Sequence, residues 1–188
     1  DGHDLVLGYA SDDDAAESTA RAVREHGRDV TLVRADLTTD AGVDLFVIRG
    51  TTVSAEHVSS RAEPLNLKQF IYELDVPVIV GGCATYQAAL HLMRTGAAGV
   101  LVGFGGGSAH TTRSVLGLTV PMATAVADVA AARRDYLDES GGRYVHVVAD
   151  GSIARSGDVA KAIACGADAV MVGSPLARDT AAPGRGWH

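Results

Sequence analysis

One stretch indicates the architecture of this chain better than any other: Gly99-Val100-Leu101-Val102-Gly103-Phe104-Gly105-Gly106-Gly107-Ser108-Ala109-His110-Thr111-Thr112-Arg113. Its first four residues form an apolar run typical of a buried parallel strand. The glycines that follow let the backbone approach a ligand closely and turn its N–H groups toward an anion. The guanidinium of Arg113 can hold a phosphate or carboxylate. Barrel enzymes bind phosphorylated substrates in loops of this kind, so the stretch predicts a phosphate-binding βα unit.

Similar apolar runs recur along the whole chain and are bounded by turn residues, which predicts buried parallel strands. Seven such runs are found, at Leu5–Tyr9, Val30–Val33, Val43–Ile48, Val76–Val80, Gly99–Val102, Tyr144–Ala149 and Ala167–Val172. Helical patterns with start and stop signals lie between them. These patterns are Ala15–His26, Leu65–Leu74, Tyr86–Arg94, Ala123–Tyr136 and Asp158–Cys165. Repeated βα units predict a single α/β domain over residues 1–188, built as a (β/α)8 barrel, a partial barrel or an open doubly wound sheet.

The spacing between the second and third predicted strands is too short for the usual crossover. Only about six residues, Leu37 to Gly42, separate them, whereas a parallel crossover needs a dozen or more. We expect Leu5–Tyr9 to pair with Val30–Val33, because the helix between them is long enough for a right-handed crossover. The short connection should force either an irregular turn or a non-adjacent position of Val43–Ile48. Seven strands are one fewer than a closed eight-stranded barrel requires, and an open strand edge can pair with another chain. We expect this edge to be covered by a homo-oligomer, or by a helix or terminal segment folded across it.

Composition narrows the class of function. The chain has 188 residues, of which 47% are hydrophobic and 5% aromatic, as suits one α/β domain. Its net charge of −7 argues against nucleic acid or an anionic membrane as a partner. Cys83 and Cys165 have no metal-ligand spacing, which predicts no metal site and a reducing, cytoplasmic setting. No signal peptide or membrane span is expected.

Four segments in the same order and at similar spacing resemble the IMP dehydrogenase/GMP reductase family. They are Val76–Gly82, the loop at 103–113, Val147–Ile153 and Ala169–Ala177, which look like the ends of that family's fifth to eighth barrel strands. The resemblance runs from about residue 41 to residue 188 and is closest to the actinobacterial IMP-dehydrogenase-like paralogues. It implies the C-terminal part of a (β/α)8 barrel.

The resemblance also implies a set of substrate-binding residues. Asp150 would accept hydrogen bonds from ribose hydroxyls, and backbone N–H groups would surround the phosphate of a nucleoside monophosphate. The residues concerned are Gly105, Gly107, Ser108, Asp150, Gly151, Ser152, Gly173 and Ser174. The alternative is ordinary local structure: Asp150-Gly151 as a turn, and Ser174 as a helix cap.

The catalytic residues depart from the family pattern. His110 stands where the family carries its nucleophilic cysteine, and Thr112 matches the position of the water-activating threonine. Imidazole is a poor substitute for a thiolate adduct, although it can act as a general base. His110 could therefore be catalytic, contact a ligand or be a loop residue without a function. For an NAD or NADP cofactor, the corresponding positions are Gly82 and Thr51.

The first forty residues resemble a different family. Leu7–Ala16 and Val30–Leu37 look like the second and third strands of short-chain dehydrogenases, without that family's glycine-rich phosphate loop. Residues 1–40 are thus predicted to be a βαβ segment of separate origin.

Three functions remain open at this stage. The first is a purine-nucleotide oxidoreductase of the IMP dehydrogenase/GMP reductase class whose catalysis is impaired by His110. The second is a phosphate- or nucleotide-binding domain without catalysis. The third is a chimeric α/β scaffold that carries inherited loops.

Overall fold

The structure is a computed structural model of the chain. It describes residues 5–9, 17, 21, 30–34, 44–49, 65–107 and 110–179. The chain divides into two compact units, one made of residues 1–44 and 176–188 and the other of residues 45–175. Each is treated by itself below.

The first unit contains the two N-terminal strands. Strand β1 (Leu5–Tyr9) runs parallel to β2 (Val30–Arg34), with Leu5 opposite Val30 and Tyr9 opposite Arg34. This confirms the predicted pairing of the first two strands. Most of the predicted helix 15–26 and of the connection 37–42 lies outside the described residues.

The second unit is built on a five-stranded parallel sheet whose strands follow chain order. The order is β3 (Phe46–Arg49), β4 (Val78–Cys83), β5 (Gly99–Val102), β6 (His146–Asp150) and β7 (Ala169–Met171). Strand β3 pairs with β4 and belongs to a different sheet from β2, as the short connection predicts. The seven strands within the described residues coincide with predicted runs, with ends shifted by up to three residues.

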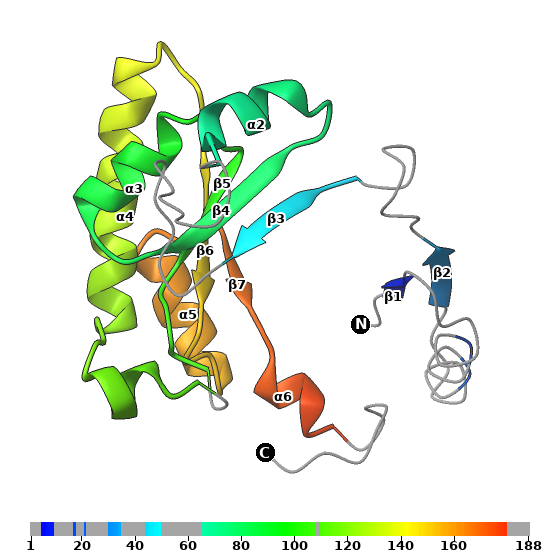
Figure 1. The fold of residues 1–188 in the computed structure, drawn as a ribbon. Coiled ribbons are helices and arrows are strands. Elements are labelled where there is room, and N and C mark those ends of the chain that lie inside the picture. Colours follow the sequence, from blue (N-terminus) through cyan, green and yellow to red (C-terminus); the bar gives the residue numbers. More distant parts are fainter. Residues whose placement is uncertain are drawn as a thin grey trace. The chain divides into compact units, whose positions relative to one another are not determined.

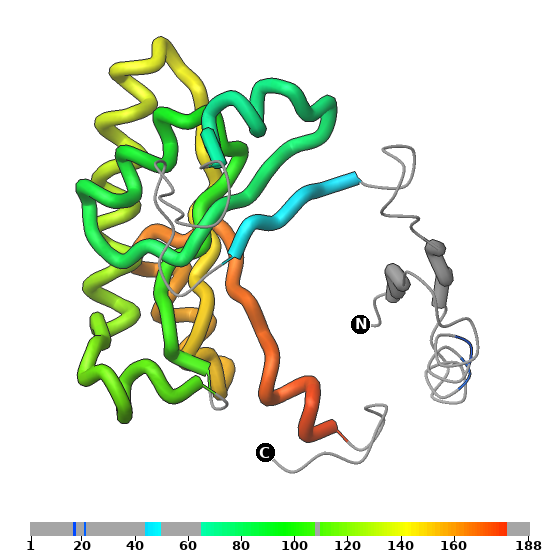
Figure 2. The backbone as a smooth tube through the Cα atoms, viewed as in Figure 1, coloured from blue at the N-terminus to red at the C-terminus, as the bar shows by residue number. Residues whose placement is uncertain are grey.

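Helices connect successive strands of this sheet. They are α2 (Leu67–Glu73), α3 (Tyr86–Met93), α4 (Met122–Glu139) and α5 (Ser156–Ala164). Figure 1 shows α3, α4 and α5 side by side on one face of the sheet, and Figure 2 lets the reader follow each return of the chain. A doubly wound sheet has helices on both faces, so this arrangement is that of a partial barrel. The short helix α6 (Ser174–Ala177) begins at the serine for which a helix N-terminus was predicted, whereas the π-helix η2 (Thr112–Leu116) was not predicted.

The main core lies between the strands and this helical layer. Val80, Val100 and Val147 are fully buried and pack in one cluster with Leu92 of α3 and Val126 of α4. Leu67 of α2 belongs to the same cluster, which places α2 against it as well. Burial of valine and leucine side chains stabilises the layer by about 2 kcal/mol per side chain. This layer therefore holds the strand ends in fixed positions.

The amino end of the sheet is fastened by a network around Asp168. The Asp168 carboxylate accepts hydrogen bonds from the Val147 N–H (2.7 Å), the Tyr144 hydroxyl (2.6 Å) and the Arg133 guanidinium (2.6 Å). Partial burial by itself raises the pKa of Asp168, but these hydrogen bonds and the Arg133 charge outweigh it and lower the pKa. Arg133 also lies over the Tyr144 ring. The network ties α4 to β6 and to the residue that precedes β7.

Within the described ranges, no helix is both long and apolar enough to cross a membrane.

We expect Asp168→Asn to lower the free energy of unfolding at pH 7 by about 2 kcal/mol, because Arg133 loses its charged partner in a partly buried position. The folded-state pKa of Asp168 is lowered, so its contribution is present at neutral pH and is lost as the pH falls through that pKa. Urea unfolding at pH 7 and below about pH 4 should show the gap between wild type and variant narrowing. Asp75→Asn, at an exposed position, is the control. An equal gap at both pH values would contradict this prediction.

Candidate functional site

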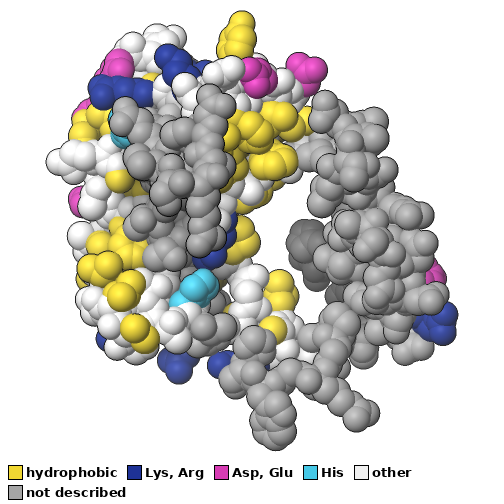
Figure 3. Space-filling view, in the orientation of Figure 1, with side chains coloured by type: hydrophobic (Ala, Val, Ile, Leu, Met, Phe, Trp, Pro, Cys, Tyr) yellow, Lys and Arg dark blue, Asp and Glu magenta, His cyan; other side chains and the backbone are white. Residues whose placement is uncertain are grey.

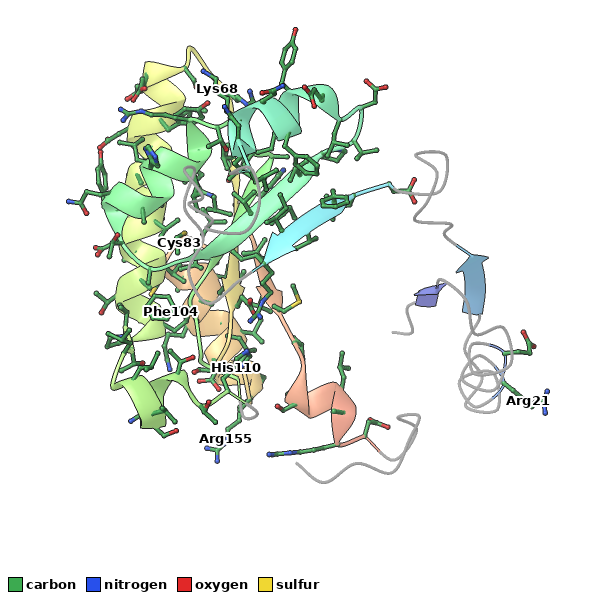
Figure 4. The ribbon with its side chains drawn as sticks, viewed as in Figure 1. Arg21, Lys68, Cys83, Phe104, His110 and Arg155 are labelled. Atoms are coloured by element: carbon green, nitrogen blue, oxygen red, sulfur yellow. The ribbon has the colours of Figure 1, made fainter. Side chains whose placement is uncertain are left out.

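The candidate site lies along the edge of the five-stranded sheet where all strands end. Because the strands are parallel, Arg49, Cys83, Val102, Asp150 and Met171 are the last residues of consecutive strands at this edge. Figure 4 shows His110 and Arg155 at the same end, after β5 and β6. Sequence reasoning placed the substrate in the loops that follow these strands, and the topology brings those loops to one edge.

An ion pair crosses the face of the sheet that is turned away from the main core. Arg49 Nε on β3 donates a hydrogen bond of 2.6 Å to Asp150 Oδ2 on β6, although β4 and β5 lie between these strands. In a flat sheet three strand spacings amount to about 14 Å. The contact therefore requires a curved sheet, with this face on the concave side. The Asp150 side chain is 7% exposed and that of Arg49 is 38% exposed.

Gly81 leaves room for this crossing. It lies in register between Arg49 and Leu101, and a Cβ added to it would come within 2.5 Å of the Leu101 Cβ. Leu101 itself is buried but is not part of the cluster under the helices. The absence of a side chain at position 81 thus allows the arginine to reach Asp150.

The loop after β5 folds back on itself around the two predicted catalytic residues. The His110 N–H donates to the Gly107 carbonyl (3.1 Å), and a Cβ added to Gly107 would lie 2.6 Å from His110 Nδ1. Thr112 packs in the same way against Gly105, whose added Cβ would lie 2.5 Å from the Thr112 Cβ. His110 is exposed and Thr112 half-buried. The glycines are needed here for close approach within the loop.

The loops after β5 and β6 are joined directly. Both the N–H and the hydroxyl of Ser152 donate to the Gly106 carbonyl, each at 3.1 Å. Gly106 packs against Gly151, since a Cβ on Gly106 would lie 3.3 Å from the Gly151 Cα. Ser152 has a φ of 58°, which is unusual for a residue with a side chain. In this structure both of its donors serve loop packing, whereas the sequence interpretation gave Ser152 to the substrate.

The end of β7 contributes to the candidate site together with the loops after β5 and β6. Asp150 is in register with Met171, so Gly151 and Ser152 leave the sheet beside the turn that holds Gly173 and Ser174. A Cβ added to Gly173 would have no heavy atom within 4 Å, which shows open space at this position. Ser108 and Thr51, two further predicted site residues, lie outside the described residues.

Gly82 and Cys83, at the end of β4, pack tightly against neighbouring protein atoms. A Cβ on Gly82 would lie 2.0 Å from the Gly103 carbonyl oxygen, so only glycine fits there. The Cys83 carbonyl accepts the Gly103 N–H (2.7 Å), and its thiol is buried near the Leu101 carbonyl. Burial raises the pKa of the Cys83 thiol to about 12. Gly82 therefore offers no side chain to a cofactor, and Cys83 is an inert thiol.

Two residues of the site were not assigned their observed roles from sequence. Arg49 was given no role, and Gly106 was not singled out among the glycines. The signal for Arg49 was present, since it is a lone charge at the end of an apolar run. Nothing in the sequence shows that the sheet bends enough to bring it to Asp150. Among the described residues, no group of three or more His, Cys, Asp or Glu side chains is placed to hold a metal ion.

Comparison with known proteins identifies the family to which this chain is similar. The sequence model of the IMP dehydrogenase / GMP reductase domain matches residues 9–187. An uncharacterized oxidoreductase of Mycolicibacterium smegmatis is 68% identical over 148 residues, which cover 78% of this chain and 40% of that protein. The inosine-5'-monophosphate dehydrogenase of Haemophilus influenzae is 43% identical over 151 residues, covering 80% of this chain and 29% of that protein.

A solved structure gives the same result. The crystal structure of an IMP dehydrogenase/GMP reductase-like protein from Corynebacterium glutamicum superposes with a TM-score of 0.69 at 56% identity, covering 89% of this chain and 45% of that one. The chain thus spans less than half the length of these three proteins. The domain match begins at residue 9, earlier than the motifs near residue 41 suggested. The likeness of residues 5–40 to short-chain dehydrogenases stays a prediction.

The positive φ at Ser152 predicts different effects for two substitutions. Ser152→Ala removes the hydroxyl bond to Gly106 and keeps the left-handed backbone, so it should cost about 1 kcal/mol in the free energy of unfolding. Ser152→Gly removes the same bond and relieves about 1 kcal/mol of backbone strain. In urea unfolding, the glycine variant should therefore be more stable than the alanine variant by about 1 kcal/mol. Equal midpoints for the two variants would show that position 152 is not strained.

Proposed function

The chain belongs to the IMP dehydrogenase/GMP reductase family, and from this premise we propose that it binds the phosphate of a purine nucleoside monophosphate at the ends of β5, β6 and β7 without catalysing the family's thiol-dependent reaction. The observation that carries the proposal is the pair of Ser152 hydrogen bonds to the Gly106 carbonyl. These bonds make one continuous surface from two glycine-rich loops. Inorganic phosphate, as the minimal ligand, would occupy the same position.

Backbone N–H groups would hold the phosphate. Gly107, Gly151 and Gly173 each follow a strand of this edge and are at least partly exposed. Successive N–H groups in such turns form anion-binding concavities that need no basic side chain. This fits an overall charge of −7, because the attraction is local. Ser108 and Ser174 would add hydroxyl groups, as their positions in the sequence motifs imply.

Asp150 would bind the ribose. Its Oδ2 accepts a hydrogen bond of 2.6 Å from Arg49, which holds the carboxylate in a fixed orientation. A carboxylate can accept several hydrogen bonds, so its second oxygen retains acceptor capacity for ribose hydroxyls. Arg49 would act here as a positioning residue for Asp150.

The same residues argue against the covalent step of the family's reaction. A thiolate is the effective nucleophile, and position 110 carries an imidazole. Cys83 is not a substitute, because its pKa of about 12 leaves it almost fully protonated at neutral pH. His110 remains at the edge as an exposed group that can contact a bound base. We assign Thr112 no step without a nucleophile beside it.

The described residues also do not fit a nicotinamide cofactor. Gly82 is buried against the Gly103 carbonyl and presents no side chain, and Arg49 is paired with Asp150. A dinucleotide ribose is usually held by a carboxylate that accepts from its hydroxyls. We therefore propose no hydride transfer for this chain, and only the family resemblance supports a role for NAD or NADP.

Calorimetry tests the binding proposal. Inosine monophosphate, guanosine monophosphate and phosphate should each bind with a Kd of up to about 1 mM, which is about −4 kcal/mol. Gly173→Asp places a carboxylate in open space at the proposed phosphate position and should weaken binding at least about tenfold by repulsion. Gly141→Asp, with equally open surroundings beyond the end of α4, is the matched control. No heat at millimolar ligand, or equal loss in both variants, would contradict the proposal.

Turnover assays test the absence of covalent chemistry. With inosine monophosphate and NAD, wild type should form no NADH, and His110→Cys should restore little, since the cofactor contacts do not fit either. The reverse assay, with guanosine monophosphate and NADPH, should also be silent. A rate of about 1 per second, which is ordinary for enzymes, in wild type would overturn this part of the proposal.

A further inference from the structure

A second candidate site lies at the amino ends of the strands, at the opposite end of the sheet from the proposed nucleotide site. A cavity of about 750 Å³ is bordered by α2, by the segments that lead into β4 and β5, and by the segment before β6. Figure 4 shows Lys68 at this end and His110 at the other. Since the strands separate the two regions, this cavity is distinct from the site proposed above.

The charge of the cavity wall is opposite to that of the chain. Lys68, Arg94 and Arg143 belong to the wall, and among the described residues no aspartate or glutamate does. The whole chain carries 23 acidic and 16 Lys or Arg side chains. Figure 3 shows Lys or Arg side chains near this end of the unit, with acidic and hydrophobic side chains beside them. The wall therefore favours an anionic ligand.

Two of the three cations are held in place. Arg94 forms two hydrogen bonds, of 2.8 and 2.7 Å, with the Glu139 carboxylate, which lies outside the wall. The Arg143 guanidinium donates to the Gly96 carbonyl, a neutral acceptor that leaves its charge uncompensated. Lys68 makes no hydrogen bond or ion pair within the part of the chain that the structure describes. Two charges, those of Lys68 and Arg143, thus remain for a ligand.

Much of the rest of the wall is apolar, although Asn66, Gln69 and Thr95 also belong to it. Ile71 and Leu74 come from α2 and the residue after it, and Val76 and Pro77 from the approach to β4. Tyr136 closes the cavity from α4 and is 7% exposed. Cavities of about 300–1,000 Å³ with apolar walls and a few polar groups are typical of small-molecule sites. The volume is that of one small organic molecule rather than a folded partner.

We propose that this cavity binds a small organic anion, in which an aromatic or branched apolar body carries one carboxylate, sulfonate or phosphate group. The anionic group would lie near Lys68 and Arg143, and the apolar body against Ile71, Val76 and Tyr136. The proposal is independent of nucleotide binding, because it uses none of the residues at the other edge.

Paired fluorescent probes test it on the whole chain. The anion 8-anilinonaphthalene-1-sulfonate should bind with higher affinity than its neutral analogue N-phenyl-1-naphthylamine, and added salt should reduce the difference. Lys68→Glu should raise the Kd of the sulfonate about tenfold, as expected for reversal of one nearby charge, and leave that of the neutral probe unchanged. Lys161→Glu, the same reversal at an exposed position on α5, is the matched control.

Amide chemical shifts locate the probe independently of any variant. Addition of the sulfonate should move the signals of Lys68, Thr95 and Gly96, and leave those of Gly106 and Gly151 in place. Equal affinity for the two probes, no effect of Lys68→Glu, an equal effect of Lys161→Glu, or shifts confined to other residues would each overturn the proposal. Circular dichroism checks that both variants fold.

Discussion

Helices α3, α4 and α5 cover the same face of the five-stranded sheet, and the arrangement of the carboxyl edge follows from this constraint. Helices on one face only allow the sheet to bend away from them, and parallel strands bring every carboxyl end to one edge. The Arg49–Asp150 ion pair is the clearest consequence, since it joins two strands that are not neighbours. A partly buried pair of this kind contributes little net stability. Its effect is to orient a carboxylate at the edge.

Close backbone approach, rather than charge, shapes that edge. Gly82 against Gly103 and Gly106 against Gly151 leave no room for side chains, so the loops after β4, β5 and β6 pack backbone to backbone. Such packing exposes N–H groups without bringing in bulky neighbours, which is what a small anion requires. A nucleophilic side chain would be a separate addition to this backbone arrangement.

The strands were predictable from sequence because they are short apolar runs, many with β-branched residues, and several end beside glycine or aspartate, as in Phe46–Arg49 and His146–Asp150. The choice between a barrel and a doubly wound sheet was not, because buried parallel strands look alike in both. Strand order and the side on which helices cross decide it, and neither is local. The candidate site was predictable at Asp150 and Gly151 from their motif. Its internal bonds, from Ser152 to Gly106 and from Arg49 to Asp150, depend on loop closure and sheet curvature.

Charged side chains have two different roles at the amino end of the sheet. At the amino end, Arg133 is paired with Asp168 and covered by Tyr144, an arrangement that fastens α4 to the sheet. Conformational stability explains such a pair, because each charge has its partner. Lys68 and Arg143 differ from this pair, because both are exposed cations of the cavity wall and neither has a carboxylate partner within the described part of the chain. Cations without a carboxylate partner in a concave wall are available to an anionic ligand, which is why the cavity, and not the Asp168 network, is the feature of this end that we propose as a binding site.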